Sequence, residues 1–376
     1  MEYIQYCLYL SLAYYSIVIL YLRYSLFNIP NKKNSNKDNV SIIIAVKDGS
    51  KSLDRLLKSL TQQTFHGKME FIIVDDNSRD NSIEIIKHYI KKDKRIIFTQ
   101  SNYGNKNLTH KKRALDAGIK IATGNILLFS DVDCILPNNW VDDIILNFNN
   151  NIDYVVGYSE VPNSYNFVTL FQKLDFFMLM NAAHASINLN WYWACSGQNQ
   201  AYKKSVFKKN NGFNQIANCL QGDDTLFFQL SKKINKNMKA VFAFNKSNKV
   251  FCRKEKNIIA FLKQRIRWSG DAIKTWKFNK CFFLMSVFTF FTNLIIFLNL
   301  FLFIYQKISL NQFIIPLTFK FFTEYYFALK GMEIHNDRYS IFQFVFWFIL
   351  QPIYIIIIGI GSFFQNHIAW KGEKNK

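Results

Sequence analysis

Apolar positions fall into two patterns along this chain. In the centre, short apolar runs rich in β-branched residues alternate with segments whose apolar residues recur at helical spacing. The short runs predict strands buried on both faces, and the helical spacing predicts amphipathic helices. The predicted strands cover residues 40–46, 71–74, 96–98, 126–129 and 154–158. The predicted helices cover residues 53–60, 82–90, 111–122, 166–184, 224–233 and 258–274.

This alternation predicts an α/β fold in which a mostly parallel sheet carries helices on both faces. Four longer apolar stretches, at 3–27, 281–305, 313–329 and 341–364, are each about long enough to cross a bilayer. The third contains Lys320 and Glu324, so it can equally be re-entrant or interfacial. We therefore expect a transmembrane anchor at 1–28, a cytosolic domain at 29–280, and a C-terminal membrane region at 281–376 with two or three helices.

Basic residues predict the orientation of the chain in a membrane. Arg23, Lys32 and Lys33 follow the first apolar stretch. The positive-inside rule then places the N-terminus outside and the central domain in the cytoplasm. Three full crossings near the C-terminus would put the basic tail at 371–376 outside, against the same rule. Either the stretch 313–329 does not cross, or the rule is broken here.

Composition narrows the class of protein. Half of the residues are hydrophobic and the formal net charge is +21. Such a charge can indicate nucleic-acid binding, but the Lys and Arg residues are scattered or lie beside apolar stretches, where they contact anionic lipid. The six cysteines lack the spacing of zinc sites or disulfide frameworks, which fits a reducing compartment. We expect membrane lipids, and no nucleic acid, among the partners.

Two acidic pairs follow predicted strands. Asp75 and Asp76 end the second strand, where a carboxylate can accept a hydrogen bond from a nucleobase N–H or a ribose hydroxyl; the alternative is a simple turn that caps the next helix. Asp131 and Asp133 follow the fourth strand. Two apart on extended backbone, they would share a face and hold one hard cation, Mg²⁺ or Mn²⁺, together with a diphosphate. The alternative is an ordinary pair of loop aspartates.

A third acidic pair, Asp223 and Asp224, opens a predicted helix. Adjacent carboxylates repel each other, so one of them is expected to have a raised pKa and to serve as a general base. The alternative is an acidic cap that the helix dipole stabilises.

Gln264, Arg267 and Trp268 fall at i, i+3 and i+4 of a predicted helix and therefore on one face. Arg267 can stabilise a diphosphate, Gln264 can bond a phosphate, and the Trp268 indole can stack on a sugar ring. The alternative is an amphipathic helix at the membrane surface, to which Lys263 and Arg265 contribute snorkelling side chains.

Three further residues remain to be assigned. Lys111 begins a predicted helix, where it either reaches a diphosphate or lies on a solvated helix face. His110 and His184 have no partner at metal-ligand spacing, so we expect both to be structural.

In this order and at this spacing, these segments resemble the family 2 glycosyltransferases, specifically their membrane-anchored branch with a Gln-x-x-Arg-Trp motif. The resemblance covers roughly residues 40–270 and implies a GT-A fold. It assigns Asp76 to the nucleotide base and Asp133 to the metal. Asp131 would reach the ribose or the metal.

The resemblance also assigns roles nearer the acceptor. It makes Asp224 the base, although the family usually has Glu-Asp where this chain has Asp-Asp. Gly197 and Asn199 lie in a G-x-N-x-A segment that backs the donor and acceptor pocket in the family; a glycine turn is the alternative.

The resemblance implies a bacterial inner-membrane enzyme that moves a hexosyl or N-acetylhexosaminyl group from a UDP-sugar, with inversion, to a lipid-linked or surface-glycan acceptor. A processive polysaccharide synthase is the alternative within the same class. A non-catalytic membrane scaffold is the alternative from another class, and the retained acidic pairs argue against it because a scaffold has no need of buried charge.

Overall fold

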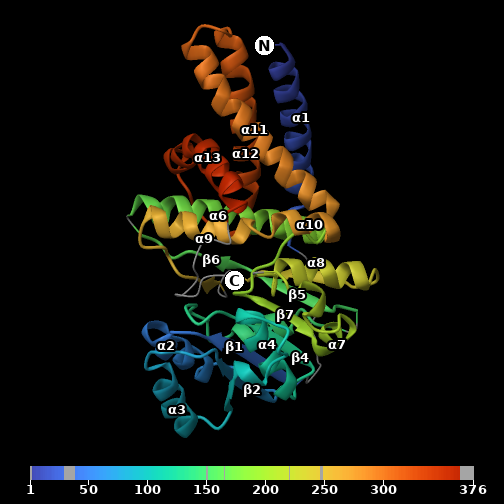
Figure 1. Cartoon of the computed structure of the whole chain (residues 1–376), viewed down its shortest axis with the longest axis vertical. Helices are drawn as coiled ribbons and strands as arrows, with labels where there is room; N and C mark the ends of the chain where they lie inside the picture. The colour runs from blue at the N-terminus through green and yellow to red at the C-terminus, as the bar shows by residue number, and fades with distance from the viewer. Residues whose placement is uncertain are drawn as a thin grey trace. The chain divides into compact units, whose positions relative to one another are not determined.

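The computed structural model describes residues 2–28, 39–149, 151–164, 166–219, 221–245 and 249–364. By their contacts the residues form two compact units. The sheet unit consists of Ile29–Pro162 and Tyr192–Arg253, and the helical unit consists of Met1–Asn28, Asn163–Trp191 and Lys254–Lys376. Figure 1 labels the elements of both. The expected linear division at 28 and 280 stays a prediction, and Lys32, Lys33 and the basic tail lie outside the described residues.

A seven-stranded sheet, ordered β3-β2-β1-β4-β7-β5-β8, forms the centre of the sheet unit. β7 runs antiparallel to its neighbours β4 and β5, and the other pairs are parallel. The strands are β1 (Val40–Val46), β2 (Met69–Asp75), β3 (Ile96–Gln100), β4 (Ile126–Phe129), β5 (Tyr154–Gly157), β7 (Gln200–Lys203) and β8 (Ala240–Ala243). A second sheet pairs β6 (Ser159–Glu160) with β9 (Val250–Phe251). The predicted α/β fold with a mostly parallel sheet is confirmed.

The register of the sheet brings the predicted acidic segments to one edge. Ile43 of β1 pairs with Ile72 of β2 on one side and with Phe129 of β4 on the other. Strand order therefore changes direction between β1 and β4, and the loops beyond their carboxyl ends diverge at such a point and leave a crevice where ligands bind. Asp75 ends β2 and Asp131 follows β4 at this edge.

The helices of the sheet unit pack along the sheet, and one of them approaches it unusually closely. They are α2 (Ser50–Thr61), α3 (Ser82–Lys92), α4 (His110–Ile121), α5 (Trp140–Ile145), α7 (Lys204–Lys209) and α8 (Thr225–Ile234), with short 3₁₀ turns at Ser101–Tyr103 and Asn214–Ile216. A Cβ on Gly118 of α4 would lie 2.7 Å from the side chain of Ile43 and 2.9 Å from that of Val74. Glycine there lets α4 lie directly on β1 and β2, which fixes where its first turn points.

The helical unit contains seven helices in its described residues: α1 (Glu2–Ser25), α6 (Phe167–Asn188), α9 (Ile258–Ser269), α10 (Ala272–Phe278), α11 (Lys280–Ile304), α12 (Leu310–His335) and α13 (Ile341–Ser362). In Figure 1, α1 and α11 run side by side, and α6 and α9 lie across them. Within the described residues, three helical stretches are long and apolar enough to cross a membrane: Tyr3–Ser25, Lys280–Ile304 and Ile341–Ser362.

The predicted helix at 258–274 is wrong, because two helices occupy this range. α9 ends at Ser269 and α10 begins at Ala272. Ser, Gly and Asp in the sequence Ser269-Gly270-Asp271 are all poor helix formers. The Asp271 carboxylate is also held by Lys274 at 2.8 Å within the first turn of α10.

Several short elements were not predicted from the sequence. α5 and α7 have six residues each, β7 and β8 have four, and β6 and β9 have two. A period of 3.6 or of 2 is not readable over so few positions. β4 and β5 also have four residues each, and both were predicted from their apolar runs, so length alone does not decide which elements the pattern finds.

The two charges of the uncertain stretch 313–329 neutralise each other inside the helical unit. Lys320 and Glu324 of α12 have no exposed surface, and their charged groups lie 2.8 Å apart. Gln351 of α13 bonds both side chains, and the Tyr15 hydroxyl of α1 donates to Glu324. A polar network therefore joins three long helices at this level. Whether α12 crosses a membrane stays a prediction.

Candidate active site

Four of the predicted site residues form one group in the sheet unit, which we call the carboxylate–lysine cluster: Lys111, Asp131, Asp223 and Asp224. The Lys111 ammonium lies 2.8 Å from a carboxylate oxygen of Asp131 and 2.8 Å from one of Asp223. Gly197 borders the same group, since a Cβ there would lie 3.1 Å from the lysine nitrogen and 3.4 Å from each carboxylate of Asp223 and Asp224. Any larger residue at 197 would crowd the cluster.

Backbone geometry at the start of α8 positions the acidic pair. Gly222 has φ of 110°, a conformation that favours glycine, and it turns the chain into the helix. Asp224 is the N-cap, and its Oδ1 accepts from the backbone N–H of Thr225 at 2.6 Å. Its Oδ2 accepts from the backbone N–H of Gly197 at 3.2 Å. The capping role offered as an alternative is therefore real, and it fixes both oxygens of Asp224 in place.

The two neighbouring carboxyl groups have opposite acidities. Burial, and then the charge of Asp223, raise the pKa of Asp224 to about 6. Burial also disfavours the charged form of Asp223, but the Lys111 ammonium outweighs it and holds the pKa of Asp223 below its usual value. The cluster thus pairs one carboxyl that can exchange a proton near neutral pH with one that stays ionised, which is the arrangement of a general base beside a fixed charge.

Asp131 and Asp133 do not lie on extended backbone, so the expected shared strand face is wrong. The backbone N–H of Cys134 donates to the carbonyl of Asp131 at 3.1 Å, which closes a turn. Val132 at the tip of this turn packs on Gly49, where a Cβ would approach it to 2.8 Å. Burial raises the pKa of the Cys134 thiol, and the charges of Asp131 and Asp133 raise it further, so both carboxylates lie near that sulfur.

These two carboxylates fit a divalent metal that a substrate helps to bind. Mg²⁺ and Mn²⁺ prefer oxygen ligands, and Mg²⁺ commonly takes one or two protein carboxylates together with phosphates and waters. Within the described residues, no group of three or more His, Cys, Asp and Glu side chains is arranged to hold a metal. Asp131 and Asp133 would therefore hold the ion jointly with a bound diphosphate.

Asp75 and Asp76 lie at the same sheet edge but have different environments. The buried Asp75 carboxylate accepts from the backbone N–H of Ser78 at 3.3 Å, as expected for the turn alternative. The backbone N–H of Asp76 donates to the carbonyl of Val46 at 2.7 Å, which ties this loop to the end of β1. Asn77 follows with φ of 56°, a conformation that Asn tolerates well. Contact of Asp76 with a nucleotide base stays a prediction.

The Asn199 side chain is occupied within the protein. Its Oδ1 accepts from the Trp140 indole N–H, and its Nδ2 donates to the carbonyl of Tyr158, both at 2.9 Å. The residue is almost fully buried. This geometry favours a role in holding the turn that carries Gly197, rather than the expected contact with an acceptor.

Gln264, Arg267 and Trp268 lie on α9, in the helical unit, so their roles stay predictions. Gln264 donates to a Glu255 carboxylate oxygen at 2.9 Å. Arg267 is half-buried, and Trp268 is exposed over about a third of its surface, 36%. Roles in binding a phosphate and a sugar require these groups to be reachable, which their partial exposure permits.

Arg265 differs from the expected snorkelling side chain, because it is buried. Its guanidinium lies 2.8 Å from a carboxylate oxygen of Asp175 in α6, and the Tyr354 hydroxyl donates to the same oxygen at 3.2 Å. It also lies 4.2 Å from the ring centre of Trp268. One face of that indole is thus covered by a cation, which leaves the other for any stacking partner.

Two residues that support the cluster were missed by the sequence analysis. Lys112 is buried, and its ammonium donates to the carbonyls of Cys219 and Gln221 in the loop before Asp223. Gln200 of β7 donates to the Asp223 carbonyl at 3.2 Å and accepts from Tyr154. Nothing in the sequence pattern singled out Lys112, apart from its position next to Lys111. Gln200 lies inside the G-x-N-x-A segment, but no feature of the sequence suggested a role for it.

His184 has a partner far away in the sequence. Its Nδ1 lies 3.3 Å from Nε2 of His335, and both rings are buried in the helical unit. His110 has φ of 52° at the start of α4. The structural role expected for both stays a prediction.

Part of this chain matches a known protein family, and the chain is similar to several known proteins. Residues 41–210 match the model of glycosyl transferase family 2. The 4,4'-diaponeurosporenoate glycosyltransferase of Staphylococcus haemolyticus is 31% identical over 137 residues, or 36% of this chain and 35% of that protein. The poly-β-1,6-N-acetyl-D-glucosamine synthase of Staphylococcus aureus is 26% identical over 172 residues, or 45% and 40%. The chain therefore spans well under half of the length of both relatives.

A solved structure covers nearly the whole chain. The mannosyltransferase of Pyrobaculum calidifontis, in complex with GDP-Man and Mn²⁺, has a TM-score of 0.62 and 13% identity, covering 96% of this chain and 98% of its own. At this identity the likeness concerns the fold. Together with the family match, it supports the expected GT-A architecture for this chain, whose residues 41–210 match the glycosyl transferase family 2 model.

Proposed function

We propose that this protein transfers a sugar, with inversion, from a nucleoside-diphosphate sugar to a hydroxyl group of a lipid-linked or surface-glycan acceptor. The observation that carries the proposal is the pair Asp223 and Asp224, in which one carboxylate stays ionised beside Lys111 while the other has a pKa of about 6. A general base works best when its pKa lies near the working pH. Asp224 meets that condition.

The proposed reaction is a single displacement. The acceptor oxygen forms a bond to the anomeric carbon as the bond from that carbon to the diphosphate oxygen breaks. The hydroxyl proton passes to the Asp224 carboxylate, and the nucleoside diphosphate leaves with the bonding electron pair. Asp224 is half-buried, so an acceptor hydroxyl can reach its carboxylate.

The remaining predicted site residues at the sheet edge bind the donor in this proposal. Lys111 supplies a positive charge for the diphosphate. Asp131 and Asp133 would hold a divalent ion, which when bound would supply positive charge next to the leaving group. The Pyrobaculum mannosyltransferase, bound to GDP-Man and Mn²⁺, supports a nucleotide-sugar donor and a divalent metal. UDP is the nucleotide that the family resemblance favours, so a panel of UDP- and GDP-sugars is the first screen.

Replacing Asp133 by Ala is expected to abolish Mn²⁺-dependent release of nucleoside diphosphate. The side chain is half-buried in a loop turn, so the fold should be retained. Release is measured with and without Mn²⁺, and circular dichroism checks the fold. Asp142, an acidic residue on α5 beyond this turn, offers a matched control as Asp142→Ala. Metal-dependent turnover by Asp133→Ala at the wild-type rate would remove Asp133 from the proposed metal site.

The value of kcat/KM should fall as the pH is lowered, with an apparent pKa near 6. Below that pH Asp224 is protonated and cannot accept the acceptor proton, so kcat/KM should drop about tenfold per pH unit. The Lys111 ammonium lowers the pKa of Asp224, so Lys111→Met should move this limb to higher pH. A pH profile of kcat/KM for both proteins measures the shift. A flat profile between pH 5 and 8 would contradict the assignment of Asp224.

We also propose that the sheet unit faces the cytoplasm of a bacterial cell and that the chain crosses the inner membrane several times. The three helical stretches of membrane-spanning length support an anchored protein. A cysteine at position 35, after the first apolar stretch, should resist membrane-impermeant thiol reagents in intact cells and react after lysis. Labelling in intact cells would reverse the proposed orientation.

Processive polymer synthesis is a second candidate, which the similarity to the Staphylococcus aureus synthase favours. The two candidates differ in product length. Products resolved by mass should carry one added sugar in the first case and a ladder in the second. A protein that releases no nucleotide with any donor would instead be the non-catalytic scaffold.

A further inference from the structure

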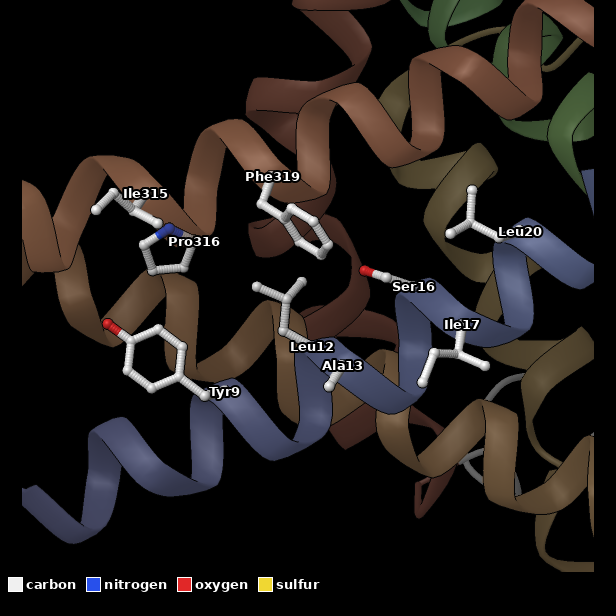
Figure 2. A pocket seen from close by; sticks show the side chains of 9 residues that line it. All are labelled: Tyr9, Leu12, Ala13, Ser16, Ile17, Leu20, Ile315, Pro316 and Phe319. Carbon is white, nitrogen blue, oxygen red and sulfur yellow. The ribbon is translucent and has the colours of Figure 1, made fainter.

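A groove lies between α1 and α12 in the helical unit. Figure 2 shows side chains from both helices pointing into it. Its volume is about 260 Å³, and it is lined by Tyr9, Leu12, Ala13, Ser16, Ile17, Leu20, Ile315, Pro316 and Phe319. Ser16 is the one residue among these with an aliphatic hydroxyl. The small side chain of Ala13 leaves space opposite Pro316 and its neighbours.

The depth of the groove limits what can enter it. Its α1 residues run from Tyr9 to Leu20, which is about 16 Å along a helix axis. They lie inside the stretch Tyr3–Ser25, which is of membrane-spanning length. In a bilayer this depth is hydrocarbon, so water is excluded. A helix about 10 Å wide would not fit inside this volume, whereas a single hydrocarbon chain would.

Ser16 is the second observation that points to a ligand. The residue is 2% exposed, and within the described residues its hydroxyl has no hydrogen-bond partner. Ser11 and Ser25 of the same helix each donate to the carbonyl three residues earlier, at 3.0 Å. A buried hydroxyl without a partner is unfavourable, and serine in an apolar helix normally bonds its own backbone. In Figure 2 the Ser16 oxygen is directed toward α12 instead.

We propose that this groove binds the unsaturated hydrocarbon chain of a lipid acceptor, with Ser16 facing a carbon–carbon double bond. The π electrons of an alkene accept a weak hydrogen bond, which a saturated chain cannot do. An isoprenoid chain has one double bond in each five-carbon unit, or one for every four carbons along the chain, so one falls opposite Ser16 over a range of positions. The identification of the chain as an acceptor tail rests on the proposed function, whereas binding of the chain itself does not.

The test uses the full-length protein in nanodiscs of saturated phosphatidylcholine. The probe is a farnesyl-type alcohol carrying a diazirine, compared with a diazirine-tagged palmitoyl alcohol. Crosslinked peptides are mapped by mass spectrometry. The isoprenoid probe should label the groove segments 9–20 and 315–319, and unlabelled isoprenoid alcohol should compete where palmitoyl alcohol does not.

Variants separate the groove from general lipid contact. Ala13→Trp fills the groove and should lower its labelling about tenfold, which corresponds to about 1.4 kcal/mol. Leu10→Trp is the matched control, because Leu10 is 70% exposed on the same helix and does not line the groove. Ser16→Ala should abolish the preference for the isoprenoid over the saturated probe. Elution on gel filtration confirms that each variant is folded.

Three outcomes would overturn the inference. Labelling spread over all lipid-facing helices and insensitive to Ala13→Trp would mean ordinary bilayer contact. Equal labelling by both probes would remove the role of Ser16. Crosslinks between two copies of the chain through these segments would make the groove a self-association surface. Nucleotide release by the wild-type protein is measured separately, so failure here and failure of the proposed transfer are distinguishable.

Discussion

Asp224→Asn is expected to lower kcat by a factor on the order of 10² to 10⁴ while barely changing donor affinity. The substitution keeps the size of the side chain, and an Asn oxygen can still accept from the backbone N–H of Thr225 as an N-cap. What it removes is the ability to take a proton. Donor affinity should persist because Lys111, Asp131 and Asp133 are untouched. Steady-state kinetics with the best donor from the screen, alongside donor binding by calorimetry, measure both quantities.

Asp223→Asn is the informative comparison, because it alters the ionised partner. Its loss removes one of the two carboxylates that hold the Lys111 ammonium and the charge that raises the pKa of Asp224. We expect weaker donor binding. We also expect the fall of kcat/KM on the acid side of the pH profile to occur at lower pH, rather than a simple loss of kcat. A near-wild-type Asp224→Asn beside an inactive Asp223→Asn would move the base to Asp223. Two active variants would leave the site without a general base.

Lys320→Met is expected to destabilise the protein by roughly 3 to 5 kcal/mol, the range for breaking a buried ion pair. Lys320 and Glu324 are fully buried and 2.8 Å apart, so the substitution leaves an uncompensated carboxylate among α1, α12 and α13. One oxygen of Glu324 already has no partner within the described residues. Unfolding in detergent, followed by tryptophan fluorescence against denaturant, measures the loss.

Two further variants on α12 test the cause. Lys320→Met combined with Glu324→Gln removes both charges and should recover most of the lost stability. Lys330→Met breaks the exposed pair with Glu333, at 2.9 Å on the same helix, and should change stability by about 0.5 kcal/mol or less. A Lys320→Met protein as stable as the wild type would indicate that this pair is not fully buried in the protein in detergent.

The sequence by itself determined the long elements and the chemistry at their ends. The strand β1 (Val40–Val46) is where its mostly apolar run predicted it, since such a run is buried on both sides when helices cover both faces of a sheet. The position of Asp131 just after β4 and of Asp224 at the start of α8 followed equally from local pattern. Parallel strands then deliver such residues to one edge, which is why the acidic segments could be grouped in advance.

Only the tertiary structure decided which charges are buried and what they touch. Lys111 and Lys112 are adjacent, yet the first joins Asp131 to Asp223 and the second holds the loop carbonyls of Cys219 and Gln221. Arg265 was expected at the membrane surface and instead pairs with Asp175, 90 positions earlier in the chain.

The physical reason is the same in each case. Hydrophobic periodicity reports which face of an element is buried, and it depends on neighbours three or four residues away. The partner of a buried charge comes from another element, and burial is tolerated only because that partner is present. No local pattern carries that information, so the carboxylate–lysine cluster and the burial of the Lys320–Glu324 pair among α1, α12 and α13 became visible only once distant segments were packed together.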